Sequence, residues 1–572
     1  MKVSSPRLSA IQAIVVLVVV CAALVVATDQ TLPPDALSST APASEFSAGR
    51  AVEHIEAIAR DVRIPGTSEY AEPRDYVVDE LSALGLRPEI QATTTGIPAE
   101  MQASFGWSEG PAIDVENVIA RMDGTGSRDA VLLVAHLDTT PYGPGATDNG
   151  AGVSVLLETA RALHEGSPVR NSVIFLFTGP EETGYHGAVA FIREHLWVED
   201  VKLVINLDSG GLSGPSELTA TSPDNGWLIS EAAKAESHFY GTSDSGEGFS
   251  DFRAFQFYGF SGFALDYSWD RRIHTPLDNI GNVNLSSLQH HGYRALDLTR
   301  HFADLDSLDD PRSSDPRYFN VLRVGVIHYS AAWVIPIAAL AVLLYAGSVA
   351  VGFRRGLLTP TGIGLGGAVF SLALVASPLL ALALWAFLSN VVGAYQETFA
   401  GHAVNEYGLF ALFATTTLAL TSTLYALIHK LRQVSAADLT IGAFGLLALA
   451  TAVFAVLMPD ASYASAWTGI AGFSAVGFWF ATSNEDQESP AIAQLLALML
   501  AALVAIILIW PAALATFMAA EAGGWFLAII LVGTLLGTLV PQVQVITRPN
   551  KWVLPGAAWV ASLALFVVAL FP

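Results

Sequence analysis

Apolar residues follow two different patterns along this chain, and the change comes near residue 333. Before that point, short apolar runs alternate with amphipathic segments and with loops rich in Gly and Pro. After it, long uncharged apolar runs follow one another. Short buried strands between helical segments are typical of an α/β domain, whereas apolar runs of about 20 residues are long enough to cross a bilayer. The sequence therefore predicts a globular α/β domain joined to an all-α multi-pass membrane domain.

Four strand-like runs in the first part end near residues that can bind metal: VLLVAHLD, SVIFLFTGPEE, VKLVINLD and GFSGFALDYSWDRRIH. Open α/β sheets keep their ligands at the carboxyl ends of such strands. Several buried carboxylates at one sheet edge require compensating cations, and divalent metal ions meet that need. The residues concerned are His136, Asp138, Asp148, Glu181, Glu182, Asp208 and His274.

The number of ligands favours two metal ions. Two imidazoles and three carboxylates, from His136, Asp148, Glu182, Asp208 and His274, are enough for two ions that share one carboxylate. Zinc suits such a nitrogen and oxygen site best, and cobalt or manganese also fits. Glu181 is next to a ligand without being required as one, so we expect it to act as the general base.

These motifs resemble a known family. The order H-x-D, A-T-D-N-G-A-G, P-E-E-T-G, N-L-D and H-T-P-x-D-N is similar to that of the co-catalytic zinc aminopeptidases that include aminopeptidase Y. The resemblance implies a mixed, mostly parallel sheet flanked by helices. It also implies that Asp148 bridges two zinc ions, that Glu181 is the base and that Asp138 orients His136. The same fold includes glutaminyl cyclases and a receptor ectodomain that lacks the metal site.

The apolar runs predict nine membrane spans. The first, residues 9–27, follows Lys2 and Arg7, and its length favours an uncleaved anchor over a signal peptide. Basic residues follow the runs that should descend to the cytoplasm, which places the α/β domain and Pro572 on the opposite side. The eight later runs lie near 333–353, 361–389, 408–428, 439–458, 464–482, 491–511, 524–543 and 552–571, and the basic loops are 354–355, 429–432 and 548–551.

The expected organisation has four parts: an anchor over 1–28, a Pro- and Ser-rich tether over 29–44, the peptidase-like domain over 45–325 and the membrane domain over 333–572. The acidic loop 484–489 would also face the cytoplasm, which agrees poorly with the predicted topology. The layout resembles the branch that includes fungal vacuolar membrane proteases and endoplasmic reticulum metallopeptidases.

Charge and cysteine content narrow the function. Of the 52 acidic residues, 44 lie between residues 28 and 325, so a basic surface for nucleic acid or for anionic lipid is not expected on this domain. The predicted spans contain essentially no charged residues, which disfavours transport. The single cysteine, Cys21, excludes a disulfide within the domain.

Some further residues allow two interpretations. Arg74 is either an exposed helix charge or a tie to the catalytic loops, and Asp251 with Arg253 belongs either to the substrate pocket or to a structural ion pair. Tyr267 is more typical of a core tyrosine than of a substrate ligand. Asp278 is expected to fix a loop, and the run GIGLGG at 362–367 to pack helices.

We therefore expect a membrane-anchored zinc peptidase that acts on peptides outside the cytoplasm and binds no nucleic acid. The sequence favours an aminopeptidase. Glutaminyl cyclase-like or carboxypeptidase activity on the same fold remains open, as does a peptidase-like receptor or assembly factor.

Overall fold

The computed structural model divides the chain into two compact units. The sheet unit is Leu32–Ser330, and the helical unit combines Met1–Thr31 with Ala331–Pro572. The structure describes residues 6–107, 110–235, 239–243, 250–309, 312–396, 406–483, 491–520, 524–547 and 550–571. Arg548, the acidic loop 484–489 and Pro572, on which part of the predicted topology rests, lie outside these ranges.

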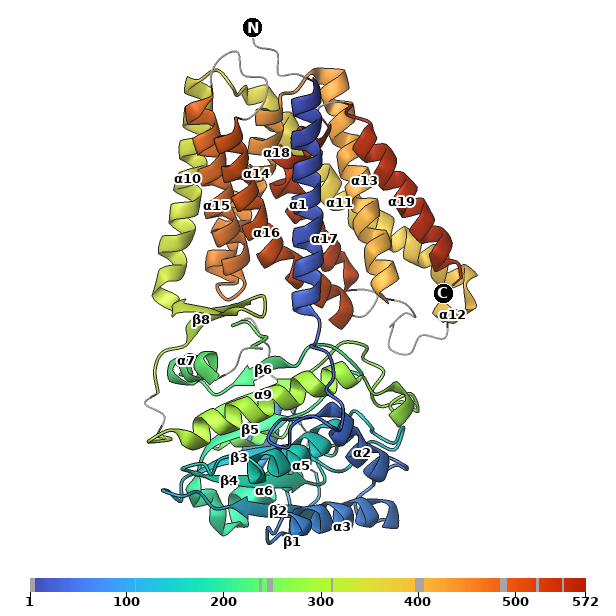
Figure 1. Cartoon of the computed structure of the whole chain (residues 1–572), viewed down its shortest axis with the longest axis vertical. Helices are drawn as coiled ribbons and strands as arrows, with labels where there is room; N and C mark the ends of the chain where they lie inside the picture. The colour runs from blue at the N-terminus through green and yellow to red at the C-terminus, as the bar shows by residue number, and fades with distance from the viewer. Residues whose placement is uncertain are drawn as a thin grey trace. The chain divides into compact units, whose positions relative to one another are not determined.

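A seven-stranded mixed sheet forms the centre of the sheet unit, with strand order β1-β2-β4-β3-β5-β7-β6 (Figure 1). The four strands β4, β3, β5 and β7 are parallel; β2 and β6 run antiparallel to them, and β1 is antiparallel to β2. This arrangement confirms the predicted mostly parallel sheet. The strands are β1 (Glu89–Thr95), β2 (Ile113–Met122), β3 (Ala130–His136), β4 (Ser172–Thr178), β5 (Val201–Leu207), β6 (Glu217–Thr221) and β7 (Gly262–Asp266).

Helices cover both faces of this sheet, which explains why the central strands are apolar at nearly every position. Alternate residues of β3 point to opposite faces: Val131 and Leu133 belong to one core cluster, and Leu132 and Val134 to the other. The first face is covered by α2 (Ala48–Ile58), α3 (Ser68–Ala83), α5 (Gly150–His164), α7 (Gly226–Ala235) and α9 (Leu285–Asp304). The second is covered by α4 (Ala99–Phe105), α6 (His186–Glu194) and α8 (Phe252–Phe257).

Shorter elements complete the sheet unit. A hairpin of β8 (Pro316–Val321) and β9 (Gly325–Ser330) stands apart from the main sheet. Two short 3-10 helices are η1 (Leu196–Asp200) and η2 (Ile280–Asn282), and a third, η3 (Ala331–Trp333), opens the later part of the helical unit.

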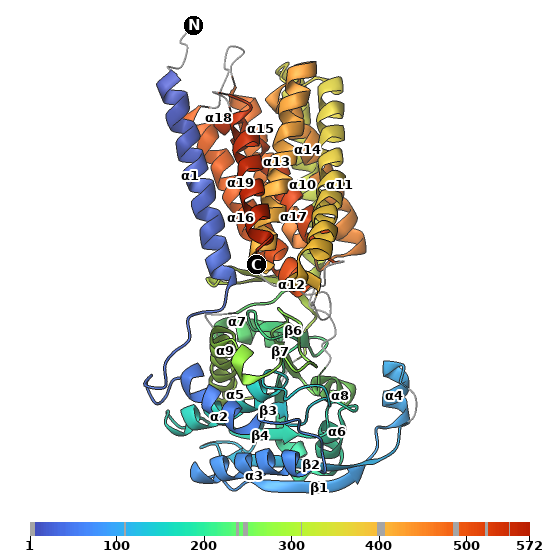
Figure 2. The same ribbon diagram turned by 90° about the vertical axis from the view of Figure 1, so that its right-hand side faces the viewer.

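The helical unit consists of antiparallel apolar helices (Figure 2). The first helix packs along α16, where the Trp510 indole N–H donates to the Thr28 hydroxyl at 2.8 Å. The helices are α1 (Pro6–Thr31), α10 (Val334–Arg354), α11 (Pro360–Val391), α12 (Gly393–Gln396), α13 (Glu406–Arg432), α14 (Ala436–Leu457), α15 (Ser462–Thr482), α16 (Ile492–Ala519), α17 (Trp525–Thr538), α18 (Val540–Thr547) and α19 (Val553–Ala569).

Each of the nine predicted apolar runs is helical, but fewer than nine qualify as spans. Within the described ranges six helices are long and apolar enough to cross a membrane, and a seventh span results if α17 and α18 count as one despite a bend of 64°. The Ser-, Thr- and Gly-containing α15 is not among the six, and α19 is short. The run 524–543 is not one straight helix. Pro541 follows the break, and a proline removes a backbone donor and disturbs the preceding turn.

Small residues let α11 and α14 approach closely, as the glycine-rich run predicted. A Cβ atom on Gly442 would lie 2.4 Å from the backbone nitrogen of Gly367. A Cβ atom on Gly362 would lie 2.2 Å from an oxygen of Asp438, whose carboxylate accepts the Thr359 N–H at 2.8 Å. Glycine is therefore required at this crossing.

Candidate metal centre

The candidate residues gather at the carboxyl edge of the parallel strands. His136 is the last residue of β3 and pairs in register with Thr178, the last residue of β4. Glu181 and Glu182 follow β4 by a short turn, and Asp208 follows β5 directly. Since parallel strands end at the same edge of a sheet, these side chains converge.

Asp148 reaches the same place from the start of α5. The next residue, Asn149, caps this helix by accepting the Gly152 N–H at 2.9 Å and donates its amide to the Leu207 carbonyl at 2.8 Å. A Cβ atom on Gly152 would lie 2.2 Å from the Asn149 oxygen, so the motif D-N-G-A-G needs a glycine there. The cap thus ties Asp148 to the end of β5, beside Asp208.

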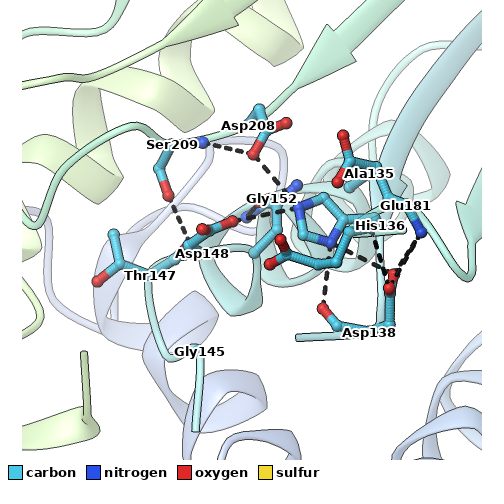
Figure 3. Close-up of polar contacts among 12 residues, drawn as sticks. Ala135, His136, Asp138, Gly145, Thr147, Asp148, Gly152, Glu181, Asp208 and Ser209 are labelled. Atoms are coloured by element: carbon cyan, nitrogen blue, oxygen red, sulfur yellow. Dashed lines mark hydrogen bonds and ion pairs between the residues drawn. The ribbon is translucent and has the colours of Figure 1, made fainter. Parts of the chain in front are cut away.

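Two groups of potential metal ligands share Asp148, and Figure 3 shows the residues of the first group. In the first, Nε2 of His136 lies 3.2 Å from Asp148 Oδ1 and 3.4 Å from Asp208 Oδ1. In the second, Nε2 of His274 lies 2.8 Å from Asp148 Oδ2 and 3.5 Å from Glu182 Oε2. The two oxygens of Asp148 therefore face different histidines.

These separations fit metal binding. Ligand atoms 2.0–2.2 Å from a tetrahedral ion lie about 3.4 Å from one another, which is close to the distances between these donor atoms. The other oxygen of Glu182, Oε1, is buried and has no hydrogen-bond partner among the described residues. A buried carboxylate oxygen without a donor is costly unless a cation meets it.

The electrostatics of the cluster also call for cations. Burial and the charge of Asp148 raise the pKa of Glu182 to about 8, and burial also raises the pKa of Glu181 well above its usual range. Burial alone would lower the pKa of His136, but Asp208 and Glu181 raise it well above its usual range. So many acids in one buried place favour protonation unless positive ions neutralise them.

Asp138 holds the turn that carries the two glutamates. Its carboxylate accepts the Glu181 N–H at 2.9 and 3.0 Å and the Glu182 N–H at 3.2 Å. Its Oδ1 is 3.6 Å from His136 Nδ1, beyond hydrogen-bond distance. The backbone carbonyl of Asp138 accepts from Nδ1 of His136 instead, at 3.1 Å, which leaves Nε2 free to bind metal (Figure 3). The residue expected to orient His136 does so through its main chain.

Asp278 fixes the loop that presents Asp148, in agreement with its predicted role. Its carboxylate accepts the N–H of Thr147 at 2.7 Å and that of Asp148 at 3.0 Å. The hydroxyl of Ser209 donates to the Thr147 carbonyl at 2.7 Å. The backbone of Thr147 and that of Asp148 itself are therefore hydrogen-bonded to neighbouring loops.

Arg63, which the sequence analysis missed, ties down the loop that follows His136. This side chain is fully buried, and its guanidinium donates to the carbonyls of Leu137 at 2.6 Å, Pro144 at 2.5 Å and Gly145 at 3.0 Å. The available signal was the motif R-I-P-G just after an amphipathic helix. Arg74, the arginine considered for this role, pairs with Asp75 and Glu116 instead.

The remaining candidates divide between core and site. Tyr267 is buried in the core against His291, which confirms the interpretation as a core tyrosine. Asp251 is buried and accepts from the Thr178 hydroxyl at the end of β4. Arg253 lies over the Phe105 ring with its guanidinium carbon 4.1 Å from the centroid.

Two histidines and three carboxylates gathered at the edge of an α/β sheet form a candidate metal centre. Residues 117–299 match peptidase family M28, so the sheet unit carries an M28 peptidase domain. The match confirms the resemblance stated from the motifs.

Proteins similar to this chain are peptidases by name. Endoplasmic reticulum metallopeptidase 1 of Mus musculus is 25% identical over 58% of this chain and 38% of its own length. The human protein of that name is 30% identical over 38% of this chain and 26% of its own length. The vacuolar membrane protease of Eremothecium gossypii is 31% identical over 38% of this chain and 22% of its own length. The chain thus spans less than two fifths of these relatives.

Solved structures similar to this chain cover less than half of it. A zinc aminopeptidase from Bacillus subtilis is 18% identical, with a TM-score of 0.38, over 46% of this chain and 98% of that chain. A glutaminyl cyclase from Porphyromonas gingivalis is 23% identical, with a TM-score of 0.37, over 44% of this chain and 98% of that chain.

Proposed function

We propose that this protein is a two-metal aminopeptidase that removes N-terminal residues from peptides. The arrangement of Asp148 carries the proposal, because its two oxygens face His136 and His274 in separate ligand groups. His136, Asp148 and Asp208 would hold one ion, and Asp148, Glu182 and His274 the other. Two zinc ions, or cobalt or manganese in their place, would supply Lewis acidity at the scissile carbonyl.

Glu181 is the proposed general base. It is buried beside the ligands but belongs to neither ligand group among the described residues. The Asp138 carboxylate accepts the backbone N–H of Glu181, which fixes the position of the backbone from which the Glu181 side chain extends. Glu181 would take a proton from the attacking water and return it to the leaving amine.

The acidity of this edge supports a substrate with a free amine. Asp138, Glu181, Asp208 and Asp251 are all buried at or next to the site. Their negative potential favours a cationic N-terminus over a C-terminal carboxylate. The negative charge of the site therefore favours an aminopeptidase over a carboxypeptidase.

We further propose that the sheet unit faces away from the cytoplasm, anchored by α1 and the later helices. The basic ends of α10 and α13 support this orientation. A C-terminal tag on the intact protein should react with an impermeant reagent only from the side opposite the cytoplasm. Accessibility from the cytoplasm alone would contradict the proposed topology.

A peptide library tests the activity. We would incubate the purified full-length protein and zinc with peptides that have free, N-acetylated or glutamine N-termini, and identify products by mass spectrometry. Stepwise loss of N-terminal residues from free peptides alone is expected. Loss of ammonia from N-terminal glutamine would indicate a cyclase, shortening from the C-terminus would indicate a carboxypeptidase, and no turnover with both metals bound would favour a receptor.

Two substitutions separate base from ligand. The Glu181→Gln variant should keep both metal ions and its affinity for peptide, while kcat falls about 10²–10⁴-fold. Glu182→Gln should lose one metal ion, with activity partly restored by excess zinc. The opposite pattern of metal content would reverse the two roles.

A further inference from the structure

A small polar pocket lies between α13 and α18 in the helical unit, and the proposed peptidase chemistry does not use it. Most of its lining is polar although both helices are predominantly apolar: Ser422, Tyr425, His429, Gln544, Thr547 and Lys551. None of its lining residues in the described part of the chain is acidic. Polar side chains that face one another inside a membrane domain usually mark a functional site.

The Tyr425 hydroxyl is the buried part of this pocket. Tyr425 is 5% exposed, and its hydroxyl has no hydrogen-bond partner among the described residues. Neighbouring polar groups are already engaged, since Ser422 donates to the Leu418 carbonyl at 2.6 Å and Thr547 to that of Val543 at 2.8 Å. Among the described residues that line the pocket, Tyr425 alone offers a free buried donor, and leaving it unpaired is costly.

Lys551 supplies positive charge at the same place. It lines the pocket and forms no ion pair within the described ranges. The His429 ring is fixed nearby, because its Nδ1 donates to the Val434 carbonyl at 2.9 Å. A cation without a counter-charge, beside a hydroxyl without an acceptor, fits an anionic group with several oxygens.

The shape of the pocket limits how that group can bind. The empty space measures about 290 Å³ with its open mouth, but only about 20 Å³ is available to the centre of a water-sized molecule. One oxygen of a phosphate can therefore reach inward, while the rest of the headgroup stays in the mouth. Next to Lys551 in the chain, Trp552 and Val553 leave 43% and 59% of their surfaces exposed, which provides apolar contact for acyl chains.

The pocket also lies at the basic end of the helical unit. Helix α18 and the C-terminal ends of α10 and α13 lie at the end where α1 begins (Figures 1 and 2). The last turns of α10 and α13 carry Arg354, Lys430 and Arg432. Basic pockets between membrane helices at such an end are typical binding sites for phosphorylated lipid headgroups.

We propose that this pocket binds the phosphate of an anionic phospholipid, with Lys551 and the Tyr425 hydroxyl as its donors. The apolar surface beside Lys551 favours a lipid over a soluble phosphate. The proposal is independent of the peptidase activity.

Lipid titration of the delipidated full-length protein, followed by native mass spectrometry, tests this site. The probes are dioleoyl phosphatidylglycerol, dioleoyl phosphatidylcholine and inorganic phosphate. Lys551→Gln should weaken phosphatidylglycerol binding about fivefold and Tyr425→Phe about tenfold. Tyr425→Phe should fold normally, since the hydroxyl that it removes has no hydrogen-bond partner among the described residues. Lys430→Gln, which removes a charge from the same end outside the pocket, is the control and should bind as the original chain does.

Three results would overturn the proposal. Equal binding of phosphatidylglycerol and phosphatidylcholine would show that the site does not select an anionic lipid. Saturation by inorganic phosphate, with the same dependence on Lys551, would assign the site to a soluble ligand. Unchanged lipid binding by Tyr425→Phe would show that the hydroxyl meets only water.

Discussion

Replacing Asp138 by Asn tests whether this carboxylate works through the glutamate turn or through the metal. In the structure it accepts the N–H groups of Glu181 and Glu182, whereas His136 is oriented by the main-chain carbonyl, which the substitution keeps. An Asn side chain retains one acceptor oxygen and turns its NH₂ toward the other N–H. At least one charge-assisted hydrogen bond is lost, worth about 1.5–3 kcal/mol.

If the lost hydrogen bond serves to position Glu181 in the transition state, kcat should drop about 10–100-fold. The assay is kcat per bound zinc, with metal content measured on the same sample and thermal unfolding as a check on folding. Asp278→Asn is the matched comparison, because its carboxylate also accepts two N–H groups but holds Thr147 and Asp148. That variant should lose zinc first.

The reasoning would be refuted if Asp138→Asn lost zinc while keeping its kcat per bound zinc. Asp138 would then act on the metal through His136, as the sequence analysis expected. An Asp138→Asn variant unchanged in both properties would remove any positioning role for the carboxylate.

Three further predictions concern stability, each measured by thermal or denaturant unfolding of the full chain. Arg63→Met should cost about 3–5 kcal/mol because three loop carbonyls lose their buried donor, whereas Arg74→Ala removes a partly exposed pair and should cost about 1 kcal/mol or less. Burial, assisted by Arg294, lowers the pKa of His291 to about 3, so the unfolded chain binds its proton first as the pH falls below about 6.5. Stability should therefore fall by about 2 kcal/mol between pH 7 and 5, and an Asn at this position should remove that part of the loss. Gly442→Ala should destabilise the helical unit, because its Cβ would lie 2.4 Å from a backbone nitrogen, while Gly364→Ala, with nothing within 4 Å, should be neutral.

The sheet and its edge were predictable because the relevant signal is local. Apolar runs such as AVLLVAH end abruptly in polar residues, and the parallel arrangement then brings separate strand ends together. The motif D-N-G-A-G likewise encodes a helix start, since Asn149 caps α5 and Gly152 makes room for it. These features depend on residues close to one another in the sequence.

The supporting contacts were not predictable in the same way. Arg63 donates to three backbone carbonyls, and any residue type can offer a carbonyl, so no pattern at Leu137 or Gly145 announces that role. Arg74 attracted attention because it lies on a recognisable helix, yet its partners Asp75 and Glu116 are surface residues. Contacts between a side chain and a distant main chain leave little trace in one sequence.

Fewer helices meet the length and apolarity of a span than the nine apolar runs predict, and the difference has a physical reason. The prediction relied on the length of each apolar run, and all nine runs are helical. However, α15 is interrupted by polar and small residues, and α19 is short. Pro541 was a local signal for the bend of 64° between α17 and α18, but the length of the apolar run led to the prediction of one span.

The acids of the site show why residue type alone could not divide its roles. Asp138 and Asp278 direct their carboxylates at backbone N–H groups, which fixes the loops, whereas Asp148, Glu182 and Asp208 direct theirs at histidine nitrogens and at one another. The carboxylates of the first set keep their N–H partners when metal is absent, whereas those of the second set would lose the cations that hold them together. Metal removal should therefore disturb the second set far more than the first. The same distinction explains why Asp138→Asn and Asp278→Asn are expected to fail through different loops, although both remove one charge from the same edge of the sheet.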